Sequence, residues 1–295
     1  MNAQLISLTA RLLSLLPLSL NRAIGASIAR LAWLANSRAR HISEINLALC
    51  YPDNSDAERK ALALRSLVHT GIQATECAWA WHRPAETTYH YVREIRGEQY
   101  LQEALAEPVG LILVSPHMGN WEICTLAVSR ITAFTYFYRT PRNPALGPLL
   151  LKGRAQLGGQ PASLDASGIR TGLRILKSGG TLGILPDQEP DRDNGVFAPF
   201  FGQPALTMTL LSRLAARSKA RVLYTISERL PGGQGWRVHY LPADPAIYDE
   251  DPVTSATAVN RDVERCIAID PAQYIWNYKR FNSLPDGTRR RYVNS

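Results

Sequence analysis

The sequence predicts an α/β fold, in which a mainly parallel central sheet is flanked by helices on both faces and preceded by a helical N-terminal arm. The chain has 295 residues, of which 45% are apolar and 20% charged, and this is enough apolar surface for a sizeable core. Short apolar segments bounded by turn residues alternate with segments of helical periodicity. Residues 1–40 differ in composition from the rest, so we expect an arm over 1–40 and a single α/β domain over 41–295.

Apolar runs and cap residues place the elements of the body. Residues 109–115 form an apolar run between Pro108 and Pro116, which is typical of a buried parallel strand. Asn120 can cap a helix that runs to about Arg130. We expect further strands over residues 134–138, 181–185, 221–227 and 236–241, and further helices over residues 56–81, 146–157, 169–177, 207–217 and 253–269. This alternation favours a parallel sheet covered by helices.

The arm combines leucines at helical spacing with scattered arginines. Pro17 separates a leucine stripe from a second apolar run over residues 24–34. The leucines of the stripe are Leu5, Leu8, Leu12, Leu15 and Leu16, and the arginines of the arm are Arg11, Arg22, Arg30, Arg38 and Arg40. The uncharged stretches reach roughly ten residues, whereas a spanning helix needs about 20 apolar residues.

Composition leaves the role of the arm open. One interpretation is an amphipathic helical pair packed on the body of the protein. The other is a membrane-surface anchor, with its leucines among the acyl chains and its arginines on lipid phosphates. Because Arg11 is the one charged residue before residue 20, a tilted span with a snorkelling arginine also fits.

The net charge limits the classes of binding partner that we expect. The chain has 33 Lys and Arg against 25 Asp and Glu, a formal charge of +8. Nucleic acid, an anionic membrane surface and an acidic partner all suit such a balance. No helix-turn-helix, zinc-finger or RNP pattern occurs, so we do not expect nucleic acid. The densest basic run, residues 289–291, is expected to be a solvated tail.

The cysteines are too far apart for a zinc knuckle or a redox CxxC motif. They are Cys50, Cys77, Cys124 and Cys266. We expect them to be reduced, buried thiols in a cytosol-facing protein.

Three potentially reactive side chains follow three successive predicted strands. His117 follows the strand over 109–115, and Arg139 and Asp187 follow the next two. In open α/β sheets the ligand crevice lies beyond the carboxyl ends of the strands. The sequence therefore predicts that these three side chains share one site.

His117 lies on a strand-to-helix turn, five residues before Glu122. Residues at that spacing in a continuous helix point about 140° apart, but a turn through Gly119 can fold the carboxylate of Glu122 back onto the imidazole. The carboxylate would then fix the imidazole tautomer, while the other ring nitrogen takes a proton from an attacking hydroxyl. The alternative is a histidine that only completes the start of a helix.

The absence of several catalytic motifs limits the kinds of reaction that we expect. The sequence contains no GxSxG, HExxH, P-loop or GxGxxG pattern, and no cysteine adjoins a histidine as a catalytic pair. This predicts direct transfer to a substrate hydroxyl, with no covalent enzyme intermediate and no metal ion. Arg139 could stabilise developing negative charge, hold a phosphate, orient Glu122 or form a structural ion pair. Asp187 opens an acidic loop that could equally be only solvated.

Several motifs in order resemble one known family. They are HMGNWE (117–122), FYRTPRNPALGPLL (137–150), ILPDQ (184–188), FAPFFGQPALTMT (197–209) and DPAQYIWNYKRF (270–281). The chain from about Leu111 onward is similar to the late acyltransferases of bacterial lipid A biosynthesis. These are the lauroyl/myristoyl transferase type of the lysophospholipid acyltransferase superfamily.

The resemblance implies transfer of a fatty acyl group from acyl carrier protein to a hydroxyl of a lipid A precursor. It implies no cofactor beyond the carrier-protein thioester, and it places the protein at the cytoplasmic face of the bacterial inner membrane, with the arm associating with the anionic lipid surface. His117 would be the general base and Glu122 its orienter. Arg139 would support the catalytic carboxylate or the acceptor. The full set of implied substrate-binding residues is Arg139, Arg154, Asp187 and Asn120.

Three alternatives to this function stay open at this point. The same chemistry could act on a lysophospholipid or another lipid hydroxyl. The arm and crevice could serve a non-catalytic membrane lipid-binding protein. A metal-dependent hydrolase is the third.

Overall fold

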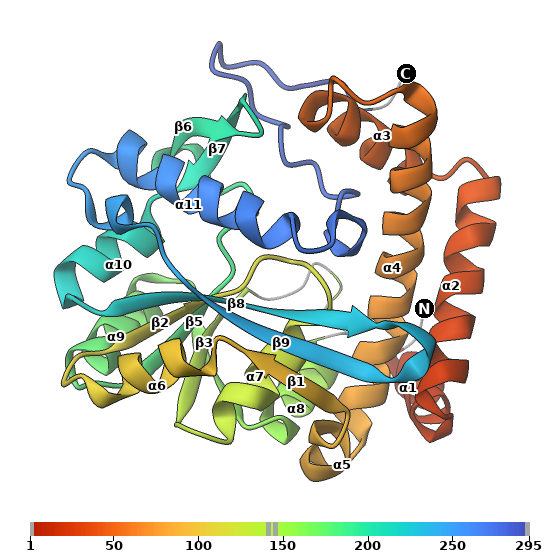
Figure 1. The fold of residues 1–295 in the computed structure, drawn as a ribbon, viewed down its shortest axis with the longest axis horizontal. Coiled ribbons are helices and arrows are strands. Elements are labelled where there is room, and N and C mark those ends of the chain that lie inside the picture. Colours follow the sequence, from red (N-terminus) through yellow and green to blue (C-terminus); the bar gives the residue numbers. More distant parts are fainter. Residues whose placement is uncertain (1–2, 140–142, 144–146, 293–295) are drawn as a thin grey trace.

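The computed structural model describes residues 3–139, 143 and 147–292 (Figure 1). Its strands are β1 (Val92–Arg96), β2 (Leu111–Val114), β3 (Phe134–Tyr138), β4 (Gly159–Ser163), β5 (Thr181–Ile184), β6 (Gly195–Phe200), β7 (Gln203–Met208), β8 (Arg221–Leu230) and β9 (Gly235–Pro242). Within the described residues, seven of them form one sheet in the order β1-β9-β8-β2-β5-β3-β4, and β6 and β7 form a separate hairpin.

The pairing of the strands confirms the mainly parallel sheet. From β8 to β4 every neighbouring pair is parallel, and Leu111 of β2 lies opposite both Thr181 of β5 and Arg221 of β8. β8 and β9 are antiparallel, and β1 runs parallel to β9. The carboxyl ends of β8, β2, β5, β3 and β4 therefore lie at one edge of the sheet.

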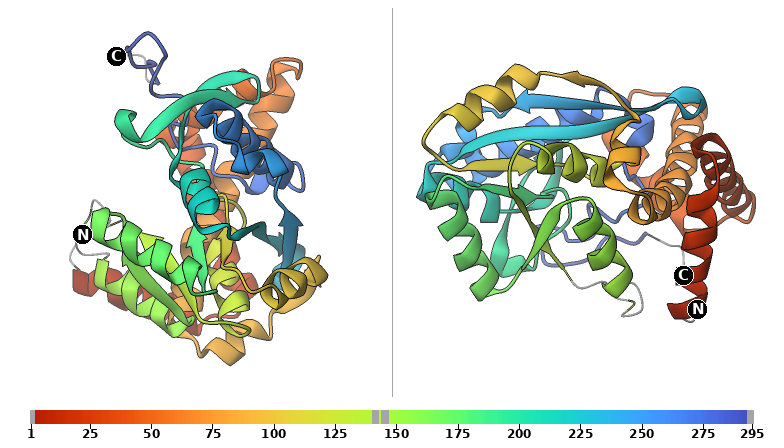
Figure 2. Two further views of the ribbon diagram at one scale, coloured as in Figure 1. Left: turned by 90° about the vertical axis from the view of Figure 1, so that its left-hand side faces the viewer. Right: turned by 90° about the horizontal axis from the view of Figure 1, so that it is seen from below.

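The helices are α1 (Ala3–Leu15), α2 (Leu18–Leu34), α3 (Arg38–Cys50), α4 (Asp56–His82), α5 (Ala85–Tyr89), α6 (Glu98–Ala106), α7 (Trp121–Ser129), α8 (Gly147–Gln156), α9 (Ala166–Lys177), α10 (Leu210–Ser218) and α11 (Pro252–Ile267). Figure 2 gives two further views of their arrangement around the sheet. The longest, α4, begins with a capping box in which Ser55 and Glu58 satisfy each other's backbone N–H groups.

Alternate side chains of β2 supply the two halves of the core. Ile112 and Val114 belong to one buried cluster, with residues of α9, α10 and α11. Leu111 and Leu113 belong to the other, with residues of α6 and α7. Because successive side chains of a strand point to opposite faces, helices cover both faces of the sheet, as the sequence predicts.

Several elements in and around the sheet differ from the prediction. The two edge strands β1 and β4 and the helix α6 were not predicted, and the sequence of β4, GQPAS, has little strand character. The sequence analysis also missed the β6–β7 hairpin, which closes on Phe201 and Gly202, both with positive φ. The helix predicted from residue 207 begins only at Leu210, because residues 207 and 208 still belong to β7. Residues 140–142 and 144–146 of the 137–150 motif, and so the first residue of the helix predicted over 146–157, lie outside the described residues.

The arm forms two helices that break at Pro17, and α2 packs along α4. The two helix backbones approach closely where glycines meet, since a Cβ on Gly25 would lie 2.5 Å from the carbonyl oxygen of Gly71. The division of the chain at residue 40 stays a prediction, and that residue lies inside α3.

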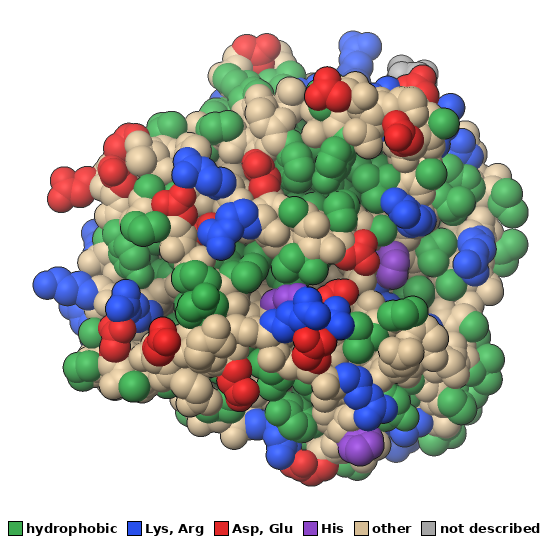
Figure 3. Space-filling view, viewed as in Figure 1, with side chains coloured by type: hydrophobic (Ala, Val, Ile, Leu, Met, Phe, Trp, Pro, Cys, Tyr) green, Lys and Arg blue, Asp and Glu red, His purple; other side chains and the backbone are tan. Residues whose placement is uncertain are grey.

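Many of the large apolar residues of the arm are exposed. Small residues of α2 such as Ala26 and Ala29 are buried, whereas Leu15 and Leu34 are 76% and 77% exposed. The exposed large apolar residues of α1 and α2 are Leu5, Leu8, Leu12, Leu15, Leu20, Ile28, Leu31 and Leu34. Figure 3 shows hydrophobic side chains along the edge formed by these helices. In the part of the chain that the structure describes, no helix has the length and hydropathy to cross a bilayer.

The close packing of α2 on α4 predicts the effect of a larger side chain. Gly25→Leu should push the two helices apart and lower the free energy of unfolding by about 1–3 kcal/mol, because an overpacked contact forces the backbone to shift. Ala23→Leu, at an exposed position of the same helix, is the matched control. Denaturant unfolding measures both variants, and an equal effect of the two would contradict the prediction.

Candidate active site

His117 lies on a tight turn that joins β2 to α7. Gly119 has a φ of +57°, and a Cβ there would lie 1.8 Å from the carbonyl oxygen of Ser227 in β8, so only glycine fits. The backbone N–H of Asn120 donates to this same Ser227 oxygen at 3.0 Å, and that of Gly119 donates to Gln273 at 3.0 Å. The turn is therefore held between β8 and the C-terminal segment.

Asp187, in the loop after β5, makes two hydrogen bonds to His117. One carboxylate oxygen accepts from the backbone N–H of His117 at 2.9 Å, and the other lies 2.7 Å from the ring Nδ1. Burial alone would raise the pKa of the Asp187 carboxyl, but the imidazole and the hydrogen bonds from His117 lower it below its usual value. An ionised carboxylate fixes the proton of the imidazole on Nδ1 and leaves the lone pair on Nε2.

The free face of His117 is partly open to solvent. Its side chain is 16% exposed, and the ring lies edge-on to Trp121 with centroids 5.0 Å apart. The side-chain amide of Gln188 lies 3.3 Å from Nε2 and can donate to the lone pair there. This nitrogen is the one that a substrate hydroxyl would meet.

The predicted contact between Glu122 and His117 is wrong, because the carboxylate on the imidazole is Asp187. Glu122 is buried in the first turn of α7 and pairs with the Arg154 guanidinium of α8, whose Nη2 lies 2.7 Å and Nε 3.0 Å from its oxygens. Burial would lower the pKa of Arg154, but the Glu122 carboxylate more than offsets this, and the pKa is raised. The solvated interpretation of Asp187 is also wrong, since the residue is buried.

The other predicted site residues fall at different depths. Arg154 is partly exposed beside Glu122, and Arg139 is exposed at the end of β3. The cation that orients Glu122 is thus Arg154. Asn120 is fully buried: its side-chain oxygen caps α7 by accepting from the Glu122 backbone N–H at 3.2 Å. The predicted cap is confirmed, and this amide holds the turn rather than facing the solvent.

A small cavity extends from this site into the sheet. It has a volume of about 30 Å³ and lies among Trp121, Arg154, Tyr136 and apolar residues of β2, β5 and α7. A cavity of this size holds no more than a few water molecules. An acyl chain entering here would have to displace these side chains.

Comparison with known proteins places the chain in a family. The family described as "Bacterial lipid A biosynthesis acyltransferase" matches residues 3–283. The lipid A biosynthesis lauroyltransferase of Escherichia coli K12 is 28% identical over 270 residues, covering 91% of this chain and 87% of that protein. The palmitoleoyltransferase of the same strain is 26% identical (92% and 87% covered), and the myristoyltransferase 24% identical (95% and 86% covered).

The family match spans nearly the whole chain. The chain belongs to the bacterial lipid A biosynthesis acyltransferase family. It is thus an enzyme of lipid A biosynthesis that transfers acyl chains, which confirms the resemblance and implies an acyl donor and a lipid A precursor.

Three of the five motifs of this acyltransferase meet at the turn of His117. HMGNWE supplies the turn itself, and ILPDQ supplies Asp187 and Gln188. The C-terminal motif holds the turn in place, because the backbone N–H of Ile275 donates to the His117 carbonyl at 3.1 Å. Segments far apart in the sequence therefore build one site.

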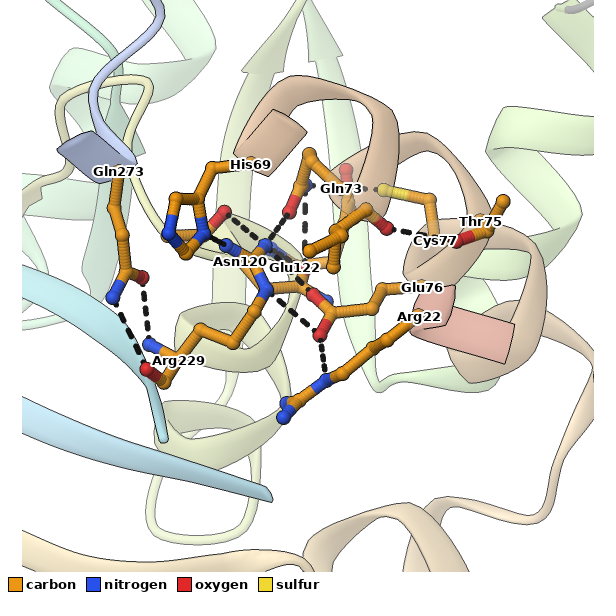
Figure 4. Close-up of polar contacts among 12 residues, drawn as sticks. Arg22, His69, Gln73, Thr75, Glu76, Cys77, Asn120, Glu122, Arg229 and Gln273 are labelled. Atoms are coloured by element: carbon orange, nitrogen blue, oxygen red, sulfur yellow. Dashed lines mark hydrogen bonds and ion pairs between the residues drawn. The ribbon is translucent and has the colours of Figure 1, made fainter. Parts of the chain in front are cut away.

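A buried polar cluster lies behind the turn (Figure 4), and sequence reasoning missed it. The carboxylate of Glu76, fully buried in α4, accepts from Arg22 of α2 at 2.6 Å and from Arg229 of β8 at 2.8 Å. Arg22, expected on a lipid phosphate, instead lies inside the protein. Burial would raise the pKa of Glu76, but the two guanidinium groups lower it below its usual value. The sequence gives only a weak indication of this cluster, because Glu76 is one acidic residue within the helix predicted over 56–81.

His69, which borders this cluster, predicts a pH dependence of stability. Arg229 lies 2.9 Å from its Nδ1, and burial together with the charge of Arg229 lowers the pKa of His69 to about 4. The unfolded chain binds this proton below about pH 6.5, so protonation favours unfolding between about pH 6.5 and 4.

We therefore expect wild type to lose stability relative to His69→Gln as the pH falls from about 6.5 to about 4, and the difference to stay level above about pH 7. Denaturant titrations at a series of pH values give the two free energies of unfolding. A difference that is independent of pH would contradict this assignment.

Proposed function

We propose that this acyltransferase moves a fatty acyl group from acyl carrier protein to a hydroxyl of a lipid A precursor, with His117 as general base. The observation that carries the proposal is the contact between His117 and the buried Asp187 carboxylate at the carboxyl ends of two neighbouring parallel strands. A base oriented in this way is the usual means of activating a hydroxyl.

The proposed reaction needs no covalent enzyme intermediate. The acceptor oxygen attacks the carbonyl carbon of the thioester, and its proton passes to Nε2 of His117. The tetrahedral intermediate then collapses: the C–S bond breaks, and the proton moves from His117 to the departing carrier thiolate. Asp187 stabilises the imidazolium between these steps.

Arg154 supplies positive charge at the small cavity that it lines with Trp121 and Tyr136. Glu122 holds its Nε and Nη2, which fixes the plane of the guanidinium over the Tyr136 ring, 4.9 Å from its centroid. A fixed guanidinium can stabilise the oxyanion of the intermediate or hold a phosphate of the acceptor. We assign Arg139, exposed at the end of β3, to the acceptor side as well.

The arm suits the cytoplasmic face of the bacterial inner membrane. The exposed leucines of α1 and α2 form an apolar surface, and Arg11, Arg30 and Arg38 are exposed on the same arm. Apolar side chains can enter the acyl region of a leaflet while arginines meet anionic headgroups. Such attachment would bring the site to a lipid acceptor.

Two neighbouring helices offer a surface for the acidic carrier protein. Neither α9 nor α10 contains Asp or Glu. Their exposed cations, with the C-cap of α10, are Arg170, Arg174, Lys177, Arg213, Arg217 and Lys219. Complementary charge mainly speeds encounter with a partner and selects it.

Replacing the base tests the mechanism. His117→Ala should lower kcat by about 10²–10⁴-fold with acyl carrier protein donors, because no other group takes the hydroxyl proton. His90→Ala, at an exposed histidine, is the matched control. Wild-type turnover by a folded His117→Ala protein would remove the proposal.

Substitutions of the two carboxylates, Asp187 and Glu122, should have different kinetic effects. Asp187→Asn should lower kcat and change its pH profile, because the imidazolium loses its stabilising charge. Glu122→Gln should mainly raise KM for the acceptor, because Arg154 loses the partner that fixes it. Steady-state kinetics over a pH series separates the two, and a pH profile altered only by Glu122→Gln would favour the pairing first expected from the sequence.

Assays with several acceptor lipids distinguish the proposed function from the alternatives. Lauroyl, myristoyl and palmitoleoyl carrier-protein donors are each offered with a lipid A precursor and with lysophospholipids, and products are read by mass spectrometry. We expect one added acyl group on the lipid A precursor. Transfer to lysophospholipid alone would change the acceptor, and lipid binding without turnover of any donor would indicate a non-catalytic protein.

Charge reversal tests the carrier surface. The double variant Arg170→Glu/Arg174→Glu should raise KM for the acyl carrier protein by about tenfold with little change in kcat, and the effect should shrink as salt rises. Arg289→Glu/Arg291→Glu makes the same charge change at the C-terminal tail and is the control. An unchanged KM in the α9 variant would exclude this surface.

A further inference from the structure

The cluster around Glu76 connects the arm to the catalytic turn. It consists of Arg22, Gln73, Glu76, Asn120 and Arg229, and we call it the Glu76 cluster. Glu76 is fully buried and faces two guanidinium groups, one from the arm and one from the sheet. One side chain thus joins three parts of the fold (Figure 4).

On one side the cluster holds the catalytic turn. Asn120 donates through Nδ2 to Glu76 at 3.2 Å, and Arg229 donates through Nη2 to the carbonyl of Gly119 at 3.1 Å. Gln73 lies between them, 3.4 Å from the Asn120 side-chain oxygen and 3.2 Å from Arg229. Both bonded turn residues lie within three positions of His117.

On the other side the cluster holds the arm. Besides Glu76, the Arg22 guanidinium donates to the carbonyls of Leu230 at 2.6 Å and Gly235 at 2.9 Å, which flank the β8–β9 connection. Arg22 is buried, while residues one to three turns further along α2, such as Ile28 and Leu31, are exposed. The surface proposed to enter the membrane and the contact with Glu76 therefore lie on opposite faces of one rigid helix.

Stability alone is a poor explanation for this arrangement. Buried ion pairs pay a large desolvation cost, and well-packed apolar residues in their place are often as stable or more so. Here a single carboxylate faces two buried arginines at the point where the arm, α4 and the turn meet. Buried polar networks of this kind can fix one geometry among several, and the geometry fixed here is that of the turn.

We propose that Glu76 is a positioning residue through which the docked arm sets the geometry of the His117 turn, so that membrane binding by the arm and catalysis are coupled. This inference rests on the proposed function for its kinetic readout. Displacement of a catalytic group by about 1 Å can cost about 10²-fold in rate. Loosening Arg22 should therefore lower kcat without removing any group that touches substrate.

The arm offers a matched control contact. Arg83, just after α4, donates to the carbonyls of Ser14 at 2.8 Å and Leu16 at 3.1 Å and stacks over the Trp79 ring. It anchors the arm to the body at a second point, and neither these two carbonyls nor the Trp79 ring belongs to the catalytic turn. A purely structural role of arm docking predicts similar effects from Arg22 and Arg83.

The experiment compares Arg22→Met, Arg22→Lys, Glu76→Gln and Arg83→Met in the full chain. Turnover is measured with the substrate in detergent and in vesicles of phosphatidylethanolamine and phosphatidylglycerol. We expect Arg22→Met and Glu76→Gln to lower kcat by about 10–10²-fold with KM for the carrier within about threefold, and to lose any stimulation by vesicles. Arg22→Lys should recover part of kcat, and Arg83→Met should keep kcat even where it lowers the melting temperature.

A readout without substrate separates this inference from the proposed function. The ring resonances of His117, assigned by their absence in His117→Ala, should shift in Arg22→Met and Glu76→Gln but not in Arg83→Met. Unchanged kcat and resonances in folded Arg22→Met, or equal losses in Arg83→Met, would overturn the coupling. If wild type acylates no lipid A precursor, the proposed function fails, while the resonances still decide whether the arm positions the turn.

Discussion

The site depends on one pair of hydrogen bonds, those that join Asp187 to the backbone and the ring of His117. They exist because β2 and β5 are parallel neighbours, so the two chain segments leave the sheet at the same edge. Burial makes the pair effective, since a carboxylate shielded from water interacts strongly with an imidazolium. The glycine turn, the contacts from β8 and the C-terminal segment all serve to keep His117 within reach of Asp187.

The sequence led to the right residues but to the wrong pairing. His117 and Asp187 could be predicted to share a site, because both follow apolar strands. The order of strands, which makes β5 rather than β3 the neighbour of β2, depends on pairing between distant segments and is not written in local patterns. Glu122 is only five residues from His117, but once α7 forms, its side chain is fixed toward Arg154 on α8. Proximity along the chain was therefore a worse guide than position at the sheet edge.

The arm is a second case in which local sequence patterns predict the elements but not their contacts. Its leucine stripe and its break at Pro17 are local features and could be predicted. The sequence did not show that α2 would bury Gly25, Ala26 and Ala29 against α4 and leave larger apolar residues such as Ile28 and Leu31 exposed. Nor could it show that Arg22 is an interior residue, since the charge that compensates it lies 54 positions away on α4. From the sequence alone, an arginine of the arm that binds a lipid phosphate cannot be told from one that pairs with a buried carboxylate.

Coupling between the arm and the turn would also protect the donor. A base that activates a lipid hydroxyl can equally activate water, and a thioester that meets such a base away from its acceptor is lost to hydrolysis. Binding energy from a remote contact can be used to assemble the reacting groups only when the correct partner is present. On this view the buried charges of the Glu76 cluster are retained despite their desolvation cost. Hydrogen bonds have a direction, so they can align the Gly119 carbonyl and the Asn120 amide with the arm. An apolar contact has no fixed direction and could not do so. The geometry of the base would then depend on the surface that holds the acceptor.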